Sequence, residues 1–365
     1  MEPLSPYSYI RNCWYVAGLS ADFPKEKLTG HVIAEHPLVI WRTKDGQVVA
    51  FDDRCAHKRF PLSKGKLMSD GTLECAYHGL RYDCSGKCVA VPAHPDGPIP
   101  PMAKMRPAPV IEQDGLVWVW PGDPARAGDR KPPRLTEVGD EKWETVVVGP
   151  HDVPSNYLLL IENLLDITHF YPLHDGNIGD IANSWIPIEM EEGETDGNKF
   201  CGTIRKVQNY KQPPFLVDWF HHETVDRVHT HFMLSPAVTR VQMRVAPPGE
   251  LGKPDKERGY VLVHTHTPIN ETSLTWRVIV NCPADHISRG DPNMSAAQRV
   301  ASMFPPVAAE DRWALEEQQR MLNFPDQGYQ EVFLKPDIAI RRARKIFLDM
   351  LRAERAPAAA SQAAE

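Results

Sequence analysis

The chain of 365 residues lacks any apolar run of about 18 residues, so we expect no helix that spans a bilayer. It also lacks a long basic run, and its net charge is −7, which argues against a nucleic-acid surface and a polybasic membrane anchor. No G-x-G-x-x-G follows a strand-like run, so we expect no nicotinamide or flavin site of its own. The first residues lack a basic region followed by an apolar core, so we expect no secretory signal and a cytoplasmic protein.

Cysteine is scarce, with seven residues, yet two of them form matching Cys–His pairs. The first pair is Cys55 and His57, the second is Cys75 and His78, and seventeen residues separate the pairs. In a reducing compartment, cysteines at such spacing serve metals more often than disulfides. Four such ligands suit a zinc ion or a [2Fe–2S] cluster with two Cys on one iron and two His on the other. Because each loop supplies one residue of each type, the order favours the cluster.

Other cysteines and histidines raise the same question without the same spacing. Cys84 and Cys88 follow the motif closely, but we expect two free or buried thiols in a turn instead of more metal. Four histidines fall within 221–231, where we expect strand-face and loop residues instead of a second metal site.

A second polar group lies in the stretch ENLLDITHFYPLH. Asn163, Asp166 and His169 are spaced three residues apart, which would place them along one face of a helix. Pro172 is expected to break that helix and let His174 fold back toward His169. Two neutral imidazoles and one carboxylate form the ligand set of non-haem Fe(II) oxygenases, which leaves coordination positions open. Taken alone, the stretch would also fit two ordinary histidines at a helix end.

Hydrophobic periodicity predicts a small β domain followed by a larger α+β domain. Short strands and turns occupy 9–120, and the Pro- and Gly-rich segment 121–135 is the expected boundary. A helix is expected to begin near Asn156, with Ser155 as its N-cap. The later strand-like runs are 185–190, 199–208, 239–247, 259–269 and 274–282. The helical stretches at the C-terminal end are 295–322 and 338–354, followed by a low-complexity tail.

The two motifs together resemble those of the Rieske non-haem iron oxygenases. The first is C-x-H-x(17)-C-x-x-H with Gly79 after it, and the second is N-x-x-D-x-x-H-x(4)-H about 90 residues later. The resemblance implies an α+β protein with an N-terminal all-β Rieske [2Fe–2S] domain over 1–122. A helix-grip-like domain of antiparallel sheet and helices would hold a mononuclear iron over 123–354, and 355–365 would be disordered.

The resemblance also implies roles for single residues. The four residues of the Cys–His pairs would bind the [2Fe–2S] cluster. His169, His174 and Asp311 would bind Fe(II), since AAEDRWALEEQQRM matches the context of the family's third ligand. Glu310 and Glu316 lie close to Asp311, so a solvated acidic helix face is the alternative for this stretch. Asp166, in the same motif as Asn163, would bridge an iron-bound histidine to a cluster histidine of a neighbouring subunit, which implies a head-to-tail homotrimer.

The implied protein is a terminal oxygenase that uses O2 and electrons from a separate NAD(P)H-dependent reductase, with or without a ferredoxin. It would monooxygenate a small aromatic substrate, by hydroxylation or by oxidative O- or N-dealkylation. RNCWYVAG and WVWPGDP resemble the group that contains phthalate dioxygenase and the vanillate and dicamba O-demethylases. Ring cis-dihydroxylation is an alternative. A Rieske electron carrier without oxygenase activity is a more distant alternative, because it would need a missing iron ligand.

Evidence on the substrate is limited to a few positions. His264 and His266 are two residues apart and should share one strand face. By resemblance, His264 falls where dicamba demethylase has a substrate-contacting histidine. Val241 stands near the position of an asparagine that helps to bind dicamba there, so dicamba is not the substrate we expect.

Overall fold

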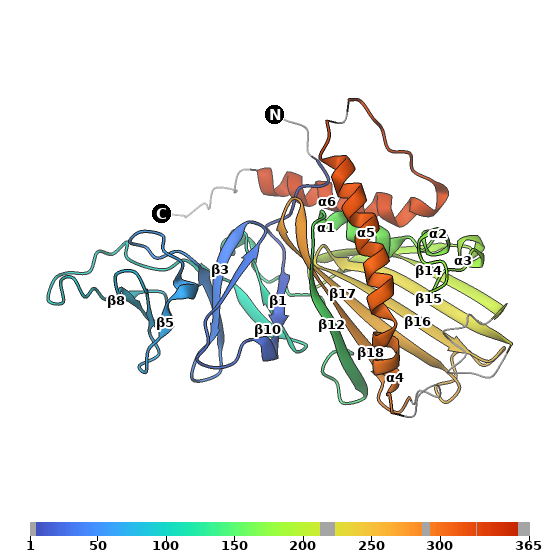
Figure 1. Ribbon diagram of the computed structural model, residues 1–365, viewed down its shortest axis with the longest axis horizontal. Helices are drawn as coiled ribbons and strands as arrows, with labels where there is room; N and C mark the ends of the chain where they lie inside the picture. Colours follow the sequence, from blue (N-terminus) through green and yellow to red (C-terminus); the bar gives the residue numbers. More distant parts are fainter. Residues whose placement is uncertain (1–4, 212–222, 287–292, 326, 357–365) are drawn as a thin grey trace, which may run out of the picture.

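The computed structural model places a small β domain beside a larger domain built on one wide sheet (Figure 1). It describes residues 5–211, 223–286, 293–325 and 327–356. Most of the expected C-terminal tail and two of the four histidines in 221–231 lie outside these ranges.

The small domain is all-β, as expected, and its strands form three antiparallel sheets. The first sheet consists of β1 (Tyr15–Leu19), β11 (Leu116–Val119) and β10 (Val110–Gln113). The second consists of β2 (Thr29–Ile33), β3 (His36–Arg42), β4 (Val48–Asp52) and β9 (Pro107–Ala108). The third consists of β5 (Lys66–Leu67), β6 (Leu73–Glu74), β7 (Arg81–Tyr82) and β8 (Cys88–Ala90). Short 3₁₀ turns are η1 (Ser20–Asp22), η2 (Leu62–Lys64) and η3 (Pro124–Arg126).

The large domain is built on a seven-stranded antiparallel sheet in the order β12-β18-β17-β16-β15-β14-β13. Its strands are β12 (Trp143–Val153), β13 (Glu189–Thr195), β14 (Asn198–Lys211), β15 (Thr224–Ser235), β16 (Val238–Ala246), β17 (Arg258–Asn270) and β18 (Ser273–Pro283). The run 185–190 was predicted as strand, but Trp185 ends a short helix and β13 begins only at Glu189.

The helices pack over one face of this sheet, and α5 runs across it in Figure 1. They are α1 (Tyr157–Leu165), α2 (Phe170–Leu173), α3 (Ala182–Trp185), α4 (Ala296–Ser302), α5 (Phe304–Leu322) and α6 (Ile338–Arg355), with η5 (Lys335–Asp337) before α6. The long helix α5 begins at Phe304, and Pro305 and Pro306 follow in its first turn, where a backbone N–H would have no partner within the helix. Its buried positions recur every three or four residues, and Asp311 occupies one of them between Val307 and Leu315.

The start and end of α1 differ from the sequence prediction. Asn156, and not Ser155, caps the helix, because its side chain accepts a hydrogen bond from the Leu158 N–H at 2.9 Å. The helix ends at Leu165, and Asp166 has an extended backbone, so Asp166 and His169 do not continue the face that carries Asn163.

Pro172 does not cause the break that was predicted there. It lies inside the short helix α2, and the chain leaves its helical path earlier, at Asp166. An extended residue at that point turns the chain before His169, so His169 and His174 lie at the two ends of α2.

The two domains share one continuous hydrophobic core. Side chains of β1 and β11 pack in the same cluster as those of α1 and β17. Hydrogen bonds also cross between the domains, from Thr267 Oγ1 to the Val16 carbonyl at 2.8 Å and from the Ile10 N–H to the Tyr157 hydroxyl at 3.1 Å. A second, smaller core surrounds Cys55 and Cys75. Across the described residues, no helix is both long and apolar enough to cross a membrane.

Candidate metal centres and active-site pocket

The four residues of the Cys–His pairs converge at the tip of the small domain. Cys55 and Cys75 are each only 2% exposed, whereas His57 and His78 are solvent-exposed and their ring centroids lie 4.5 Å apart. The Tyr82 hydroxyl lies 3.2 Å from Cys55 Sγ. An inner pair of thiols and an outer pair of imidazoles match a cluster with one iron on each pair.

The two loops that carry these residues have matching backbone geometry. The Arg59 N–H donates to the Cys55 carbonyl at 2.8 Å, and the Gly79 N–H donates to the Cys75 carbonyl at 3.0 Å. Arg59 and Gly79 both have positive φ, at 55° and 70°. A Cβ on Gly79 would lie 2.9 Å from a side-chain carbon of Pro92, which explains the glycine in the second loop.

The described residues contain one group of three potential ligands for a single metal ion, formed by His169, His174 and Asp311. Their ligand atoms all lie within 4.8 Å of one another. His174 Nε2 is 3.2 Å and His169 Nε2 is 3.6 Å from Asp311 Oδ1. No such group forms around Cys84 and Cys88 in the described part of the chain.

The other ring nitrogen of each histidine is held by a fixed partner. His169 Nδ1 lies 2.6 Å from the Asp166 carbonyl oxygen, and His174 Nδ1 lies 2.7 Å from Glu310 Oε2. The second oxygen of Glu310 accepts a hydrogen bond from Asn177 Nδ2 at 2.7 Å. Because each Nδ1–H has an acceptor, each Nε2 carries a lone pair directed at the Asp311 side of the site. Glu310 was not assigned a role from the sequence.

Asp166 contacts its neighbours in a different way from the one expected. Its carboxylate accepts hydrogen bonds from the N–H and the hydroxyl of Thr168, at 2.9 and 2.5 Å. Arg205 Nη2 lies 4.0 Å from it. The contact with His169 is made by the backbone carbonyl, and the carboxylate that orients His174 belongs to Glu310.

The donor set of the triad fits a mononuclear iron. His174 is fully buried and its Nε2 has no hydrogen-bond partner, which is costly unless a ligand completes the site. Burial lowers the pKa of His169, so its imidazole is neutral and can bind a cation. Burial also opposes protonation of His174, but the nearby carboxylates of Asp311 and Glu310 outweigh that and raise its pKa. Asn163 Nδ2 donates to Asp311 Oδ1 at 2.9 Å and fixes the carboxylate.

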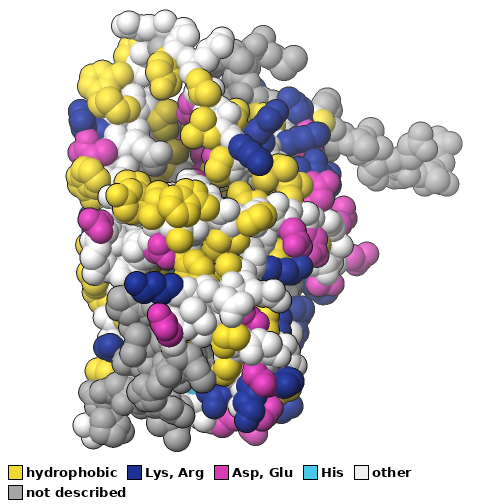
Figure 2. Space-filling view, turned by 90° about the vertical axis from the view of Figure 1, so that its right-hand side faces the viewer, with side chains coloured by type: hydrophobic (Ala, Val, Ile, Leu, Met, Phe, Trp, Pro, Cys, Tyr) yellow, Lys and Arg dark blue, Asp and Glu magenta, His cyan; other side chains and the backbone are white. Residues whose placement is uncertain are grey.

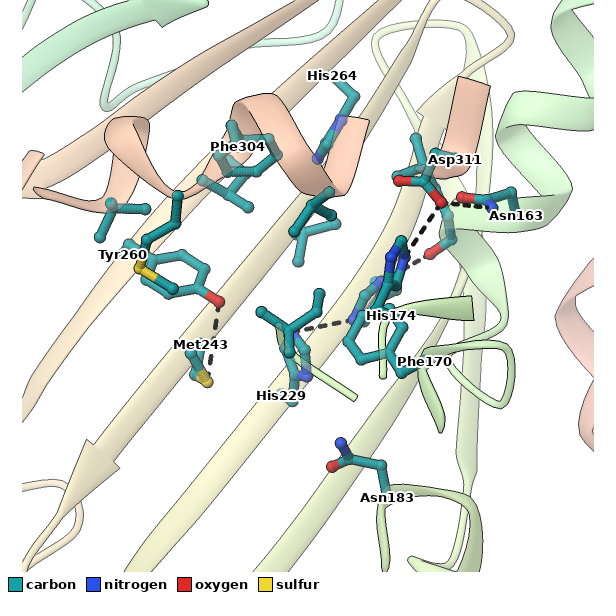
Figure 3. Close-up of a pocket in the computed structure, with 18 of the residues that line it drawn as sticks. Asn163, Phe170, His174, Asn183, His229, Met243, Tyr260, His264, Phe304 and Asp311 are labelled. Atoms are coloured by element: carbon teal, nitrogen blue, oxygen red, sulfur yellow. Dashed lines mark hydrogen bonds and ion pairs between the residues drawn. The ribbon is translucent and has the colours of Figure 1, made fainter. Parts of the chain in front are cut away.

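The triad opens into a largely apolar pocket between the sheet and the helices (Figure 3). Its apolar lining consists of Leu164, Phe170, Ile178, Val241, Met243, Leu262, Val300, Met303, Phe304 and Val307. Its polar lining beyond the triad consists of Asn163, Asn183, Arg227, His229, His231, Tyr260, His264 and Arg299. An apolar cavity with a few polar groups beside a metal triad can bind a small organic molecule with one carbon near the metal.

His264 is built into the pocket wall as a hydrogen-bond donor. Trp276 Nε1–H donates to His264 Nδ1 at 3.2 Å, and the two rings stack with centroids 5.9 Å apart. Because Nδ1 accepts this hydrogen bond, the proton of the neutral ring is on Nε2. His266, two residues on, is instead bonded to the Pro236 carbonyl at 3.2 Å and to Thr239 Oγ1 at 3.0 Å.

Two of the histidines in 221–231 lie on strand β15, as expected, but the sequence did not predict that they line the pocket. His231 Nδ1 lies 2.6 Å from the Leu164 carbonyl, and His231 Nε2 lies 3.1 Å from His229 Nε2. His231 therefore donates its Nδ1–H to the Leu164 carbonyl, and its Nε2 accepts a hydrogen bond from His229 Nε2–H. Burial lowers the pKa of His231 to about 3 and that of His229 well below its ordinary value, so both rings are neutral.

Comparison with known proteins gives matches over both domains. The Rieske [2Fe-2S] domain family matches residues 13–106, and the vanillate O-demethylase oxygenase C-terminal domain family matches residues 153–353. The chain is 30% identical to the toluene-4-sulfonate monooxygenase system iron-sulfur subunit of Comamonas testosteroni, over 95% of this chain and 98% of the relative. It is also 30% identical to the vanillate O-demethylase oxygenase subunit of Pseudomonas sp. (strain HR199 / DSM 7063), over 97% and 98%. The crystal structure of dicamba monooxygenase bound to dicamba matches with a TM-score of 0.81 and 29% identity, over 95% of this chain and 99% of that chain.

Proposed function

Because the chain belongs to the Rieske non-haem iron oxygenases with a vanillate O-demethylase-type catalytic domain, we propose that its two groups of ligands hold that family's two cofactors. Cys55 and Cys75 would bind one iron of the [2Fe–2S] cluster, and His57 and His78 the other. The mononuclear iron would be bound by the triad on α2 and α5. The observation that carries the proposal is the pair of Nε2 atoms that face the Asp311 carboxylate at the wall of an apolar pocket.

The relatives are monooxygenases and O-demethylases, and the chain is an oxygenase component of that kind, which favours monooxygenation over ring dihydroxylation. The mononuclear iron, when bound, supplies the site of O2 activation. One oxygen atom enters a C–H bond of the substrate and the other leaves as water, which consumes two electrons and two protons. If the oxidised carbon is an O-methyl or N-alkyl carbon, the product is unstable and releases an aldehyde.

Three residues around the triad have positioning roles in this proposal. Asn163 holds one oxygen of Asp311, so the carboxylate keeps a fixed direction. Glu310 fixes the ring of His174 and strengthens its Nε2 as a ligand, as carboxylates beside metal-bound histidines do. The Asp166 carbonyl does the same for His169.

We place the electron path across a subunit interface. In one chain the cluster loops belong to the lobe with β5 and β8, at the opposite end of the molecule from α2 (Figure 1). Figure 2 shows hydrophobic side chains gathered on the face at the α2–α3 end, where Tyr171, Ile181 and Trp185 are 48%, 38% and 72% exposed. Tyr77, beside His78 at the cluster tip, is 60% exposed. A head-to-tail ring, a homotrimer, would bring the tip of one chain to this face of the next, with Asp166 between the two centres.

Electrons would come from a separate NAD(P)H-dependent reductase, either directly or through a ferredoxin. The relatives are named as subunits of multi-component systems, which supports an external donor. The exposed His57 and His78 offer such a donor close approach to the cluster.

The proposed substrate is a small aromatic compound, held by the apolar walls of the pocket. His264 would donate its Nε2–H to a polar substituent. Val241 lies in the same wall and offers no hydrogen bond, which argues against dicamba as the substrate.

The test is turnover of an aromatic panel by purified protein with NADH, a surrogate reductase and ¹⁸O2. We expect one labelled oxygen atom per product, with formaldehyde released from methoxy compounds. A cis-diol with two labelled atoms would refute the monooxygenase assignment. Electron uptake without any O2-dependent product from the panel would favour a Rieske electron carrier instead.

A further inference from the structure

The pocket contains a buried cation that the proposed chemistry leaves without a function. Arg227 lies on β15, lines the pocket and is 2% exposed. One of its Nη2 hydrogens is donated to Asn183 Oδ1, and the guanidinium lies 4.2 Å from the centroid of the Tyr210 ring. Its Nε is buried and has no hydrogen-bond partner.

Burying this charge is expensive, because no carboxylate in the described part of the chain forms an ion pair with it. Burial lowers the pKa of Arg227 to about 10, so the guanidinium stays protonated at neutral pH. Asp180 is close enough to favour the charged form, but its carboxylate is engaged by the Tyr210 hydroxyl and the Ala182 N–H. Among the described residues no carboxylate forms an ion pair with Arg227 within 4.0 Å. A buried guanidinium without a counter-ion costs free energy that a bound anion would recover.

The register of the sheet places this cation away from the triad. Alternation along β15 directs Arg227, His229 and His231 to the same face, which is the pocket face. His231 contacts the end of α1, close to the triad, and Arg227 stands four residues away, about 13 Å along the strand. Figure 3 shows Asn183, the partner of Arg227, well apart from Asp311, with His174 and Phe170 between them. The two histidines between them are neutral, so they do not offset the charge.

We propose that Arg227 binds an anionic substituent of the substrate, a carboxylate or a sulfonate, while the carbon to be oxidised lies at the triad. This inference rests on the proposed oxygenase function and narrows its substrates to aromatic anions. The free Nε–H supplies a charge-assisted hydrogen bond, and the planar guanidinium suits the oxygens of either anion. The apolar residues between Arg227 and the triad then hold the aromatic ring. The pocket therefore selects its substrate by both length and charge.

The experiment compares acids with their neutral amides on iron-loaded protein without reductant, so that no turnover occurs. The probes are methoxy- and methyl-substituted benzoates and benzenesulfonates, each paired with its primary amide or sulfonamide. Dissociation constants are measured by isothermal titration calorimetry for the wild type, Arg227→Gln and Arg227→Lys. Arg244→Gln is the matched control, because Arg244 lies on the neighbouring strand β16 and pairs with Glu257 at 2.6 Å outside the pocket.

We expect the wild type to bind at least one acid about 10- to 100-fold more tightly than its amide. Arg227→Gln should abolish that preference, Arg227→Lys should retain part of it, and Arg244→Gln should leave it unchanged. The preferred probe class, benzoate or benzenesulfonate, identifies the anion.

Two results would overturn the inference. One is the absence of any acid preference in the wild type across the panel, which needs no variant to fold. The other is an acid preference that persists in a folded Arg227→Gln. Turnover of neutral amides without acid preference would leave the oxygenase function standing and reject only the role of Arg227. Acid preference without any product would reject the oxygenase function and keep the anion site.

Discussion

Glu310→Gln should weaken binding of the mononuclear iron while leaving the three ligands in place. Glu310 Oε2 lies 2.7 Å from His174 Nδ1, and its other oxygen is fixed by Asn177, so the carboxylate is held in one orientation. Gln keeps the size and one hydrogen-bond acceptor but loses the negative charge that makes His174 a stronger ligand. Loss of such a partner costs about 10- to 100-fold in metal affinity, which is about 1.4 to 2.7 kcal/mol.

The assay is an anaerobic Fe(II) titration against a competing chelator, on protein stripped of mononuclear iron but with its cluster intact. Glu316→Gln is the matched control, because Glu316 lies on the same helix and pairs with Arg312 at 2.5 Å on the exposed side. We expect a raised Kd in Glu310→Gln alone, with the cluster absorbance unchanged in both variants. A Kd within about twofold of the wild type in folded Glu310→Gln would show that this carboxylate does not orient His174 for metal binding.

Three further predictions concern the cluster, the electron path and pH. Cys75→Ser should lose the red-brown cluster colour, and an unchanged visible spectrum would reject Cys75 as a cluster ligand. Asp166→Asn should retain metal and accept electrons but reoxidise its pre-reduced cluster orders of magnitude more slowly with substrate and O2; wild-type rates would remove Asp166 from the path. Burial lowers the pKa of His266 from the ordinary 6.5 to about 3. As pH drops from about 6.5 toward 3, the unfolded chain is therefore protonated at His266 while the folded chain is not, and the free energy of unfolding falls. At pH 5.5 this costs about 1.4 kcal/mol of folding stability. The melting temperature should therefore drop less between pH 7.5 and 5.5 in His266→Gln than in the wild type, and an equal drop would show that His266 is not the residue responsible.

Much of the fold follows from patterns in the sequence. Alternating β-branched residues predicted β16, β17 and β18, and apolar spacing predicted α5 and α6. The ends of α1 were harder, because Ser155 and Asn156 are both good N-caps and only the tertiary structure decides between them. The early end of α1 had no clear signal either, since the six residues after Leu165 include no Gly or Pro and the helical spacing of polar residues continues to His169.

Some residues of the site could likewise be predicted from the sequence, and others could not. His169 and His174 could be found from their motif, and Asp311 carries a second signal, because it interrupts the buried stripe of α5 between Val307 and Leu315. Glu310 could not be found, since its role depends on how α5 packs against α2. Arg227 could not be found either, because an arginine on an alternating strand is usually a solvated residue and only the sheet register places it inside the pocket.

The central claim is that one chain holds two metal centres with separate ligands, and iron and acid-labile sulfide analysis of purified protein tests it most directly. The wild type should contain about three irons and two sulfides per chain, as one [2Fe–2S] cluster and one mononuclear iron require. His169→Ala should contain two irons and two sulfides, with an unchanged cluster spectrum. Stoichiometric zinc without sulfide in the wild type, or loss of the cluster together with His169, would contradict the account.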